Sequence, residues 1–201
     1  MLLALLIAAA APAMTAIDAE RAFAAAAQTD GQWTAFRRYA TENAVMFVPQ
    51  VVKAQEFLKD REDPPKAIEW WPTESYVSCD ETLAINTGGW KRPDGAVGYF
   101  TTVWQRQADG GWKWIVDGGD ELTAPRERPA EPKLVKPDCA TKAIPLVTIG
   151  APPSGSGQSK DSTLNWYWAV EPDLSRQFSA KIWNGHDYVA VIDNDIAAPP
   201  K

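Results

Sequence analysis

The hydrophobic pattern of this 201-residue chain changes at Glu69, and that change constrains the fold more than any other feature. Before Glu69 the apolar residues recur every three or four positions, and after it they recur at every second position. Period two is typical of strands with one side against a core. Polar turns separate the apolar segments, among them Asp109-Gly110, a common hairpin turn. Antiparallel strands are therefore predicted at residues 76–79, 83–87, 97–107 and 112–117.

The region before Glu69 predicts helices. Asp18 is placed to begin one, and Asp30-Gly31 is placed to end it. Helices are predicted at residues 18–30 and 33–40, a strand at 44–49 and a third helical segment at 52–60. Helices followed by an antiparallel meander give an α+β fold, with the helices on one face of a bent sheet.

The rest of the chain divides into a connector and a second module. Four prolines lie between Ala124 and Pro137, so residues 123–140 are predicted to be a stiff, solvated linker. Residues 141–201 are predicted to form a small all-β module. Its strands are expected near 163–171, 177–183 and 188–193, after an apolar run at 143–149 and a flexible loop from Pro152. A small number of short strands buries little apolar surface by itself, so the module is expected to pack against the first domain.

The first 16 residues resemble an export signal. They carry no charged side chain, and their apolar run is shorter than the ~20 residues that span a bilayer. Small residues allow cleavage after Ala13 or after Ala16, which predicts a periplasmic or secreted protein without a stable membrane span. The formal charge of −6, without clustered Lys and Arg, argues against a nucleic-acid partner.

Cys79 and Cys139 are the only cysteines. In an oxidising compartment such a pair is a disulfide candidate, and closing a loop of about 60 residues is worth roughly 4 kcal/mol in the chain-entropy model. Two separate thiols are the alternative, because the sequence does not fix their distance. Neither cysteine has a His or Cys partner at ligand spacing, and His186 follows a hairpin turn, so no metal site is expected. No cofactor motif is present in the sequence either.

Several short motifs, in their order and spacing, resemble one known family. They are Ala19-Glu-Arg-Ala-Phe-Ala, Val45-Met-Phe-Val-Pro, Leu83-Ala-Ile-Asn-Thr-Gly, Val103-Trp-Gln-Arg-Gln and Asp109-Gly-Gly-Trp. Over residues 17–122 the chain resembles the SnoaL-like branch of the nuclear transport factor 2-like superfamily. The resemblance implies a cystatin-like cone, in which a curved antiparallel sheet wraps around helices and encloses an apolar pocket. It also implies a homodimer paired through the outer face of the sheet.

That resemblance does not imply one chemistry. The superfamily contains ketosteroid isomerases, polyketide cyclases, dehydratases and members that bind or assemble without catalysis, so the function has to be argued from the site.

A two-residue turn at Asp109-Gly110 would pair Thr102 with Asp117 and Trp104 with Ile115. One face of the hairpin would then carry Phe100, Thr102, Trp104, Ile115 and Asp117, and the other Tyr99, Val103, Trp112, Trp114 and Val116. We expect the first face to line the cone and the second to meet another layer, either the C-terminal module or a second subunit. Most of these tryptophans are expected to be packing residues.

Asp117 is the carboxylate of greatest interest. In an apolar cone it would have a raised pKa and could act as a general base toward an acidic C–H. Such chemistry also needs a hydrogen-bond donor for the enolate oxygen. The candidate donors are Tyr39, Tyr76 and Tyr99, none of them in a recognisable catalytic motif. The alternative places Asp117 at a solvated strand end, because Gly118-Gly119 is typical of a turn.

Three hypotheses follow. The first is an exported domain that binds a small apolar ligand without catalysis, with Phe100, Thr102, Trp104, Ile115, Tyr39 and Tyr76 as contacts. The second is an enzyme of the isomerase, cyclase or dehydratase type that uses Asp117. The third is a structural or assembly protein whose cone is filled by its own side chains. The absence of a recognisable acid/base pair favours the first.

Overall fold

The computed structural model describes residues 13–146, 150–151 and 153–200. Most of the predicted leader, residues 147–149 of the apolar run and Pro152 lie outside the described residues. The helices are α1 (Ala16–Asp30), α2 (Gln32–Tyr39) and α3 (Ala54–Leu58). The strands are β1 (Ala40–Phe47), β2 (Val51–Lys53), β3 (Glu69–Val77), β4 (Leu83–Lys91), β5 (Val97–Arg106), β6 (Trp112–Leu122), β7 (Lys133–Val135), β8 (Ser154–Gln158), β9 (Leu164–Val170), β10 (Arg176–Trp183) and β11 (Tyr188–Ile196).

The N-cap of helix α1 lies three residues before the predicted cap, Asp18. Thr15 is the N-cap, and its hydroxyl accepts from the backbone N–H of Asp18, whose carboxylate accepts in return from the backbone N–H of Thr15. This reciprocal pair is a capping box. The helix turns into α2 at Gly31, whose φ of +105° favours glycine.

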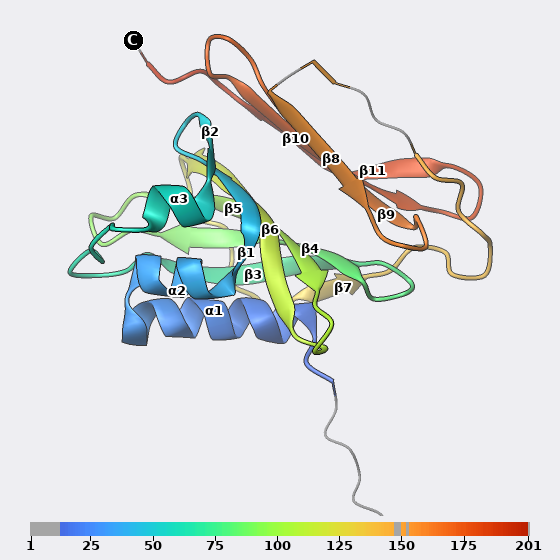
Figure 1. Cartoon of the computed structure of the whole chain (residues 1–201), viewed down its shortest axis with the longest axis horizontal. Coiled ribbons are helices and arrows are strands. Elements are labelled where there is room, and N and C mark those ends of the chain that lie inside the picture. Colours follow the sequence, from blue (N-terminus) through green and yellow to red (C-terminus); the bar gives the residue numbers. More distant parts are fainter. Residues whose placement is uncertain (1–12, 147–149, 152, 201) are drawn as a thin grey trace, which may run out of the picture.

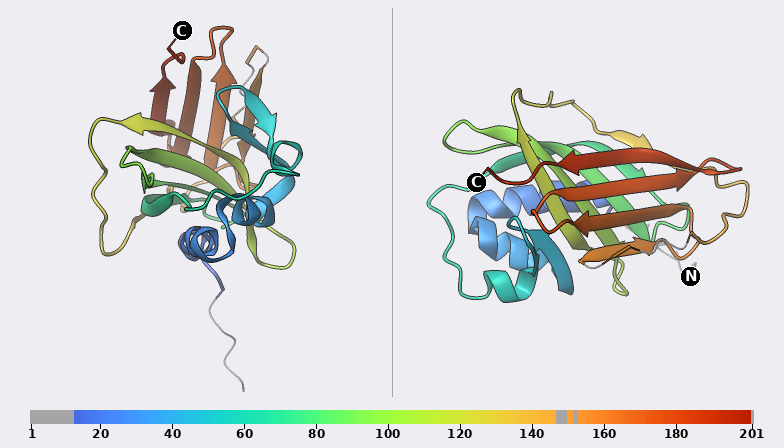
Figure 2. Two further views of the ribbon diagram at one scale, coloured as in Figure 1. Left: turned by 90° about the vertical axis from the view of Figure 1, so that its left-hand side faces the viewer. Right: turned by 90° about the horizontal axis from the view of Figure 1, so that it is seen from above.

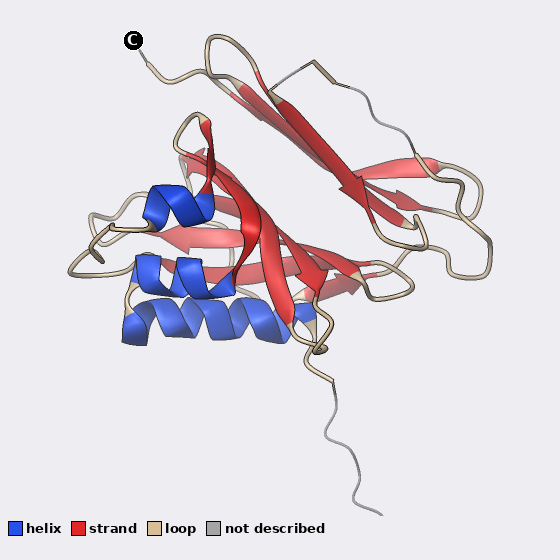
Figure 3. Ribbon diagram, in the orientation of Figure 1, coloured by secondary structure: helices blue, strands red, loops and turns tan. Residues whose placement is uncertain are grey.

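Strands β1 to β7 form one curved sheet with the helices on a single face (Figures 1 and 3). Its order is β2-β1-β6-β5-β4-β3-β7, and most neighbours are antiparallel, although β1 runs parallel to β6 and β7 parallel to β3. The α+β architecture is the expected one. Strand β7 lies within the predicted linker, so part of that segment is an edge strand and not only a solvated connector.

The β5–β6 hairpin differs from the predicted register near its turn. Gln107 donates its N–H to the carbonyl of Gly111, so the turn has three residues and Trp104 pairs with Trp114. A bulge at Ile115 then restores the predicted pairing of Thr102 with Asp117. The face assignments near the turn were therefore wrong. Trp112 and Trp114 pack with buried residues of the helices inside the cone, and Ile115 packs on the opposite side of the sheet.

Gly118 and Gly119 were predicted to form a turn, and they lie inside β6 instead. The cause is the close approach of β5, because a Cβ on Gly119 would lie 2.0 Å from the carbonyl oxygen of Tyr99. These glycines allow two strands to pass closely where a side chain would separate them. As a result β6 runs five residues beyond Asp117, to Leu122.

Strands β8 to β11 form a second sheet, in the order β11-β10-β9-β8, which lies across the outer face of the first (Figure 2). Strand β8 falls in the segment that was predicted to be a flexible loop, so that prediction was wrong. Its glycines are used for packing: a Cβ on Gly155 would lie 2.6 Å from the Trp168 ring, and one on Gly157 would lie 2.8 Å from the Trp166 ring. The indole rings thus lie directly on the β8 backbone.

The second layer on the outer face is therefore the C-terminal module of the same chain. Ile85, Val103 and Val116 of the first sheet share an apolar cluster with residues of the second, including Leu164 and Trp168. Cys79 and Cys139 form the predicted disulfide, which links the β3–β4 turn to the segment before β8. Within the described residues, no group of His, Cys, Asp and Glu could hold a metal ion, and no helix is long and apolar enough to cross a membrane.

Candidate functional site

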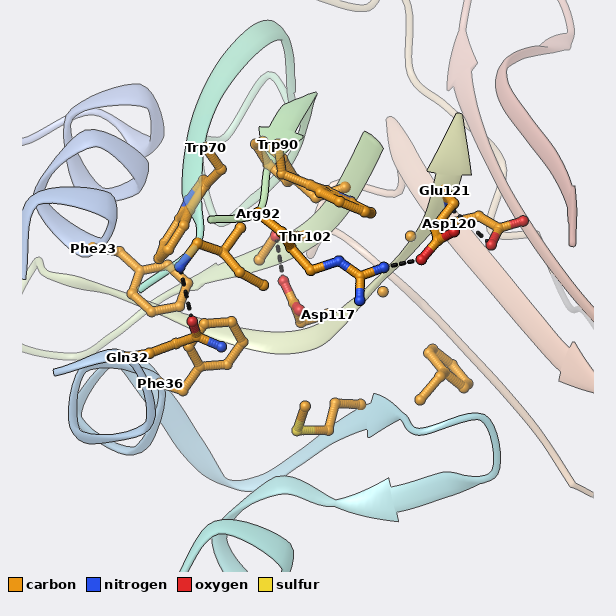
Figure 4. Close-up of a pocket in the computed structure, with 16 residues that line it drawn as sticks. Phe23, Gln32, Phe36, Trp70, Trp90, Arg92, Thr102, Asp117, Asp120 and Glu121 are labelled. Atoms are coloured by element: carbon orange, nitrogen blue, oxygen red, sulfur yellow. Dashed lines mark hydrogen bonds and ion pairs between the residues drawn. The ribbon is translucent and has the colours of Figure 1, made fainter. Parts of the chain in front are cut away.

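A pocket of about 330 Å³ lies inside the cone, between the helices and the sheet (Figure 4). Six of its sixteen lining residues are aromatic. They come from α1, α2 and four strands, so the pocket draws on the whole first domain. Its lining residues are Phe23, Gln32, Phe36, Met46, Phe47, Ile68, Trp70, Trp90, Arg92, Phe100, Thr102, Asp117, Gly118, Gly119, Asp120 and Glu121.

Asp117 is the acid inside this pocket. Its Oδ2 accepts a hydrogen bond from the hydroxyl of Thr102 at 2.7 Å, and Oδ1 has no partner among the described residues. The side chain is enclosed by protein except where it faces the pocket, and burial raises the pKa of Asp117 to about 7, although the Thr102 bond lowers it. The predicted alternative of a solvated strand end does not describe this position.

Gln32, at the start of α2, places a hydrogen-bond donor in the same pocket. The side chain is only 3% exposed, and its Oε1 accepts the backbone N–H of Ile68 at 2.9 Å. That bond fixes the orientation of the amide, so the Nε2 group, which has no partner among the described residues, is a free donor. Figure 4 shows Gln32 between Phe23 and Phe36.

A second buried acid, Glu20 on α1, lies behind the pocket wall. It is fully buried and accepts three hydrogen bonds: from Trp70 Nε1 at 2.9 Å, from Trp104 Nε1 at 2.7 Å and from Asn86 Nδ2 at 3.2 Å. Burial raises its pKa to about 7 against the effect of these donors, and the charge of Asp117 adds to the rise. Because Trp70 lines the pocket, Glu20 fixes the orientation of one pocket wall.

The rim of the pocket carries charged residues of both signs. Arg92 is paired with Glu121 and lies over the ring of Trp90, 5.1 Å from its centroid. Asp120 has no cationic partner within ion-pair distance among the described residues. Arg176 lies close enough to Asp120 for the two charges to interact, so the positive and negative charges around the rim nearly balance.

The structure brings together only part of the predicted ligand-contact set. Phe100 and Thr102 line the pocket with Asp117. Trp104 lies behind the wall, bound to Glu20, and Tyr39 packs against Phe23 and Trp104 without lining the pocket.

Two predicted contacts lie on the other side of the sheet. Ile115 packs with the cluster between the sheets because of the bulge. Tyr76 also belongs to that cluster, and its hydroxyl donates to the Glu74 carboxylate. Tyr99 lies under the guanidinium of Arg126, outside the pocket lining. None of the three candidate tyrosines therefore donates into the pocket, and His186 is exposed after its hairpin turn.

Sequence reasoning missed Glu20 and Gln32. A signal for Glu20 exists, because it lies at helical spacing from Ala16 and Phe23 and so on the apolar face of α1. An acid on that face predicts a buried, hydrogen-bonded carboxylate. Gln32 has no comparable signal, since its burial depends on how α2 meets the segment before β3.

No family model and no curated protein sequence matches the chain. Among solved structures, a "putative ketosteroid isomerase" from Parabacteroides distasonis aligns with 54% of this chain and 89% of its own, with 13% identity and a TM-score of 0.44. The CaMKII hub of S. rosetta aligns with 57% of this chain and 100% of its own, with 20% identity and a TM-score of 0.42. Another "putative ketosteroid isomerase", from Shewanella frigidimarina, covers 53% and 95%, with 19% identity and a TM-score of 0.40. These likenesses concern the fold alone.

Proposed function

We propose that this protein binds a small, largely apolar molecule in the pocket of its cone. The observation that carries the proposal is an aromatic-walled pocket of about 330 Å³ with an acid, Asp117, inside it. Pockets of this size with few polar groups are typical of small-molecule sites. A pocket of this volume favours ligand binding over the third hypothesis, a cone filled by its own side chains.

The polar groups restrict the ligand. Asp117 Oδ1 is a free acceptor, and Gln32 Nε2 is a free donor, so the ligand should carry a donor for the first and an acceptor for the second. The charges at the rim nearly balance, whereas the carboxyl group of Asp117 inside the pocket disfavours anions. A neutral molecule or one with a basic nitrogen fits best.

A direct test is a titration with N-phenyl-1-naphthylamine, a neutral aromatic amine whose fluorescence rises in apolar sites. We expect saturable binding with a dissociation constant on the order of micromolar. Asp117→Asn should weaken binding roughly three- to tenfold, because it weakens the acceptor for the amine N–H. Asp60→Asn is the matched control, because Asp60 is exposed and lies outside the pocket lining, so little effect is expected. A flat titration of the wild-type protein would contradict the proposal.

Catalysis by Asp117 is the second candidate, and one observation favours it. A pKa near 7 in an apolar pocket suits a general base at neutral pH, and Gln32 supplies the donor for an enolate oxygen that the tyrosines do not. The test is exchange of the α-hydrogens of 2-tetralone in deuterated water, followed by NMR. Enzyme-dependent exchange should rise with pH through about 7, as Asp117 ionises, and be lost in Asp117→Asn. Exchange no faster than in buffer would remove this candidate for that substrate class.

Export remains part of the proposal. The Cys79–Cys139 disulfide supports it, because such bonds persist in oxidising compartments. Dimerisation also remains a proposal, with one restriction. The outer sheet face, through which pairing was expected, is covered by the C-terminal sheet, so a dimer would use another surface.

A further inference from the structure

Arg176, the first residue of β10, connects the C-terminal sheet to the rim of the pocket. Its Nη1 donates to the carbonyl of Pro49 at 3.4 Å, and its Nη2 donates to the carbonyl of Gly119 at 3.3 Å. Its guanidinium carbon lies 5.8 Å from the ring centroid of Phe47. One side chain of the second sheet thus contacts both β6 and the segment after β1.

The groups that Arg176 contacts form part of the pocket. Phe47, Gly118 and Gly119 all line it. The Phe47 ring lies directly on Gly118, where an added Cβ would be 2.9 Å away, and it meets the ring of Trp168 edge to face at 5.4 Å. Phe47 is therefore held between the pocket and the second sheet.

Several other polar attachments of the second sheet lie elsewhere. The disulfide at Cys79 and the paired bonds between Asp80 and Asp161 are at the β3–β4 turn. That turn contacts the beginning of β6, through Thr82 and Arg106, whereas Gly119 lies about 23 Å further along the strand at ~3.3 Å per residue. Arg176 thus acts at a separate place, together with Asn194, whose Nδ2 donates to Thr101 Oγ1 at 3.3 Å beside Gly118.

We propose that Arg176 and Trp168 are positioning residues for the ligand pocket, which makes the C-terminal sheet a functional part of the site. They hold Phe47 and Gly119 from behind and touch no ligand themselves. The inference rests on the proposed binding function, and it predicts that the pocket loosens when the guanidinium is removed.

The test uses the full oxidised chain. Arg176→Met keeps the apolar stem and removes the guanidinium, Arg176→Lys keeps a charge with one donor group, and Lys181→Ala is the matched control on the same strand. We expect Arg176→Met to weaken N-phenyl-1-naphthylamine roughly five- to tenfold, Arg176→Lys to recover part of that loss, and the control to bind normally. In Phe47→Leu, which removes the ring, Arg176→Met should add little further loss.

Amide hydrogen exchange separates the two proposals. Arg176→Met should speed exchange in residues 45–51 and 116–122 while leaving β9 and β11 protected. Faster exchange there, together with no probe binding by the wild-type protein, would refute the binding function and keep the positioning role. Three results would each overturn the positioning role. They are unchanged amide exchange in Arg176→Met, an unchanged affinity of that variant for the probe, and losses of affinity that simply add when Arg176→Met is combined with Phe47→Leu.

A different set of contacts bears on leader removal. The carbonyl of Met14 accepts from Trp112 Nε1 at 3.0 Å, and Thr15 caps α1. Ala16 is 2% exposed, and its carbonyl accepts from Asn86 Nδ2 at 2.9 Å. Cleavage after Ala16 would remove all three partners and put a new ammonium group at the start of a buried helix face.

We infer that the leader is cut between Ala13 and Met14. Ala13 is exposed, and Ala11-Pro12-Ala13 has the small-x-small pattern of export signals, whereas Met14-Thr15-Ala16 has a bulky first residue. The test is N-terminal sequencing of the chain exported with its own leader from a bacterial host. A mature start at Met14 is expected, and Ala13→Leu should block that cut. A start at Ile17, or an exported chain that keeps its leader, would overturn the inference.

Discussion

The two faces of the seven-stranded sheet are buried in opposite ways. The inner face carries Asn86, Thr102 and Asp117 among its tryptophans and meets Glu20 from α1. The outer face is largely apolar where Ile85, Val103 and Val116 meet the second sheet. An apolar face is sufficient to join two layers, so the polar groups of the inner face need another explanation.

The difference between the two faces indicates that the polar groups of the inner face lower the stability of the fold. Burying carboxyl groups without a cation is costly, and the pKa values of Glu20 and Asp117 are both raised to about 7 as a result. Trp114 Nε1 and Asn86 Oδ1, also on the inner side, have no hydrogen-bond partner among the described residues. Buried polar groups without partners and buried acids without cations are most often found at functional sites, and the inner face has both.

The largest effect is expected on the outer face. Leu164 is fully buried between the sheets, so Leu164→Ala should lower the free energy of unfolding by about 2–5 kcal/mol. The loss of unfolding free energy should be the same at pH 5 and pH 8, because no acid with a raised pKa lies in that cluster. Urea denaturation at both pH values measures it. A loss that changed strongly with pH would show that the two faces are not energetically separate.

The next effect belongs to the inner face and depends on pH. Between about pH 4.5 and 7 the folded state keeps a proton on Glu20 that the unfolded chain has released, so the free energy of unfolding falls as the pH rises through that interval. Glu20→Gln removes this pH-dependent loss of stability, which amounts to at most about 3 kcal/mol. The stability curve of Glu20→Gln should therefore be flatter than that of the wild type.

Denaturation at pH 4, 6 and 8 provides the comparison. Glu131→Gln is a suitable control, because Glu131 is exposed and pairs only with Arg21. A wild-type curve that rises between pH 4.5 and 7, or equal slopes for the wild type and Glu20→Gln, would contradict the assignment of a raised pKa to Glu20.

Sequence patterns predicted the α+β architecture, the disulfide and the pairing of Thr102 with Asp117. They failed where one extra residue in a turn or a bulge changes which residues of two strands pair. The three-residue turn and the bulge at Ile115 offset each other, so the pairing is right at Asp117 and wrong at Trp114. Strand β8 was missed because Gly155 and Gly157 have no strand propensity of their own, and their role depends on indole rings from β9.

The candidate site was predictable only in part, for a similar reason. Asp117 is found from strand alternation and Glu20 could have been found from helical spacing, since both are local patterns. Gln32 and Arg176 act through contacts between segments far apart in sequence, with Ile68 and with Gly119 respectively. Periodicity carries no information about such contacts.

The smallest effect tests the Thr102–Asp117 hydrogen bond. Thr102→Val keeps the shape and removes the donor, so it should cost about 1 kcal/mol at pH 5 and more at pH 8, where the buried carboxylate loses its hydrogen bond. Because that bond lowers the pKa of Asp117, its removal should raise the pKa further. NMR titration of the Asp117 carboxyl carbon measures the shift. Thr101→Val, on the outer face of the same strand, should leave the Asp117 titration unchanged. If both variants shift it equally, the pocket acid is responding to the sheet as a whole and the two faces are coupled.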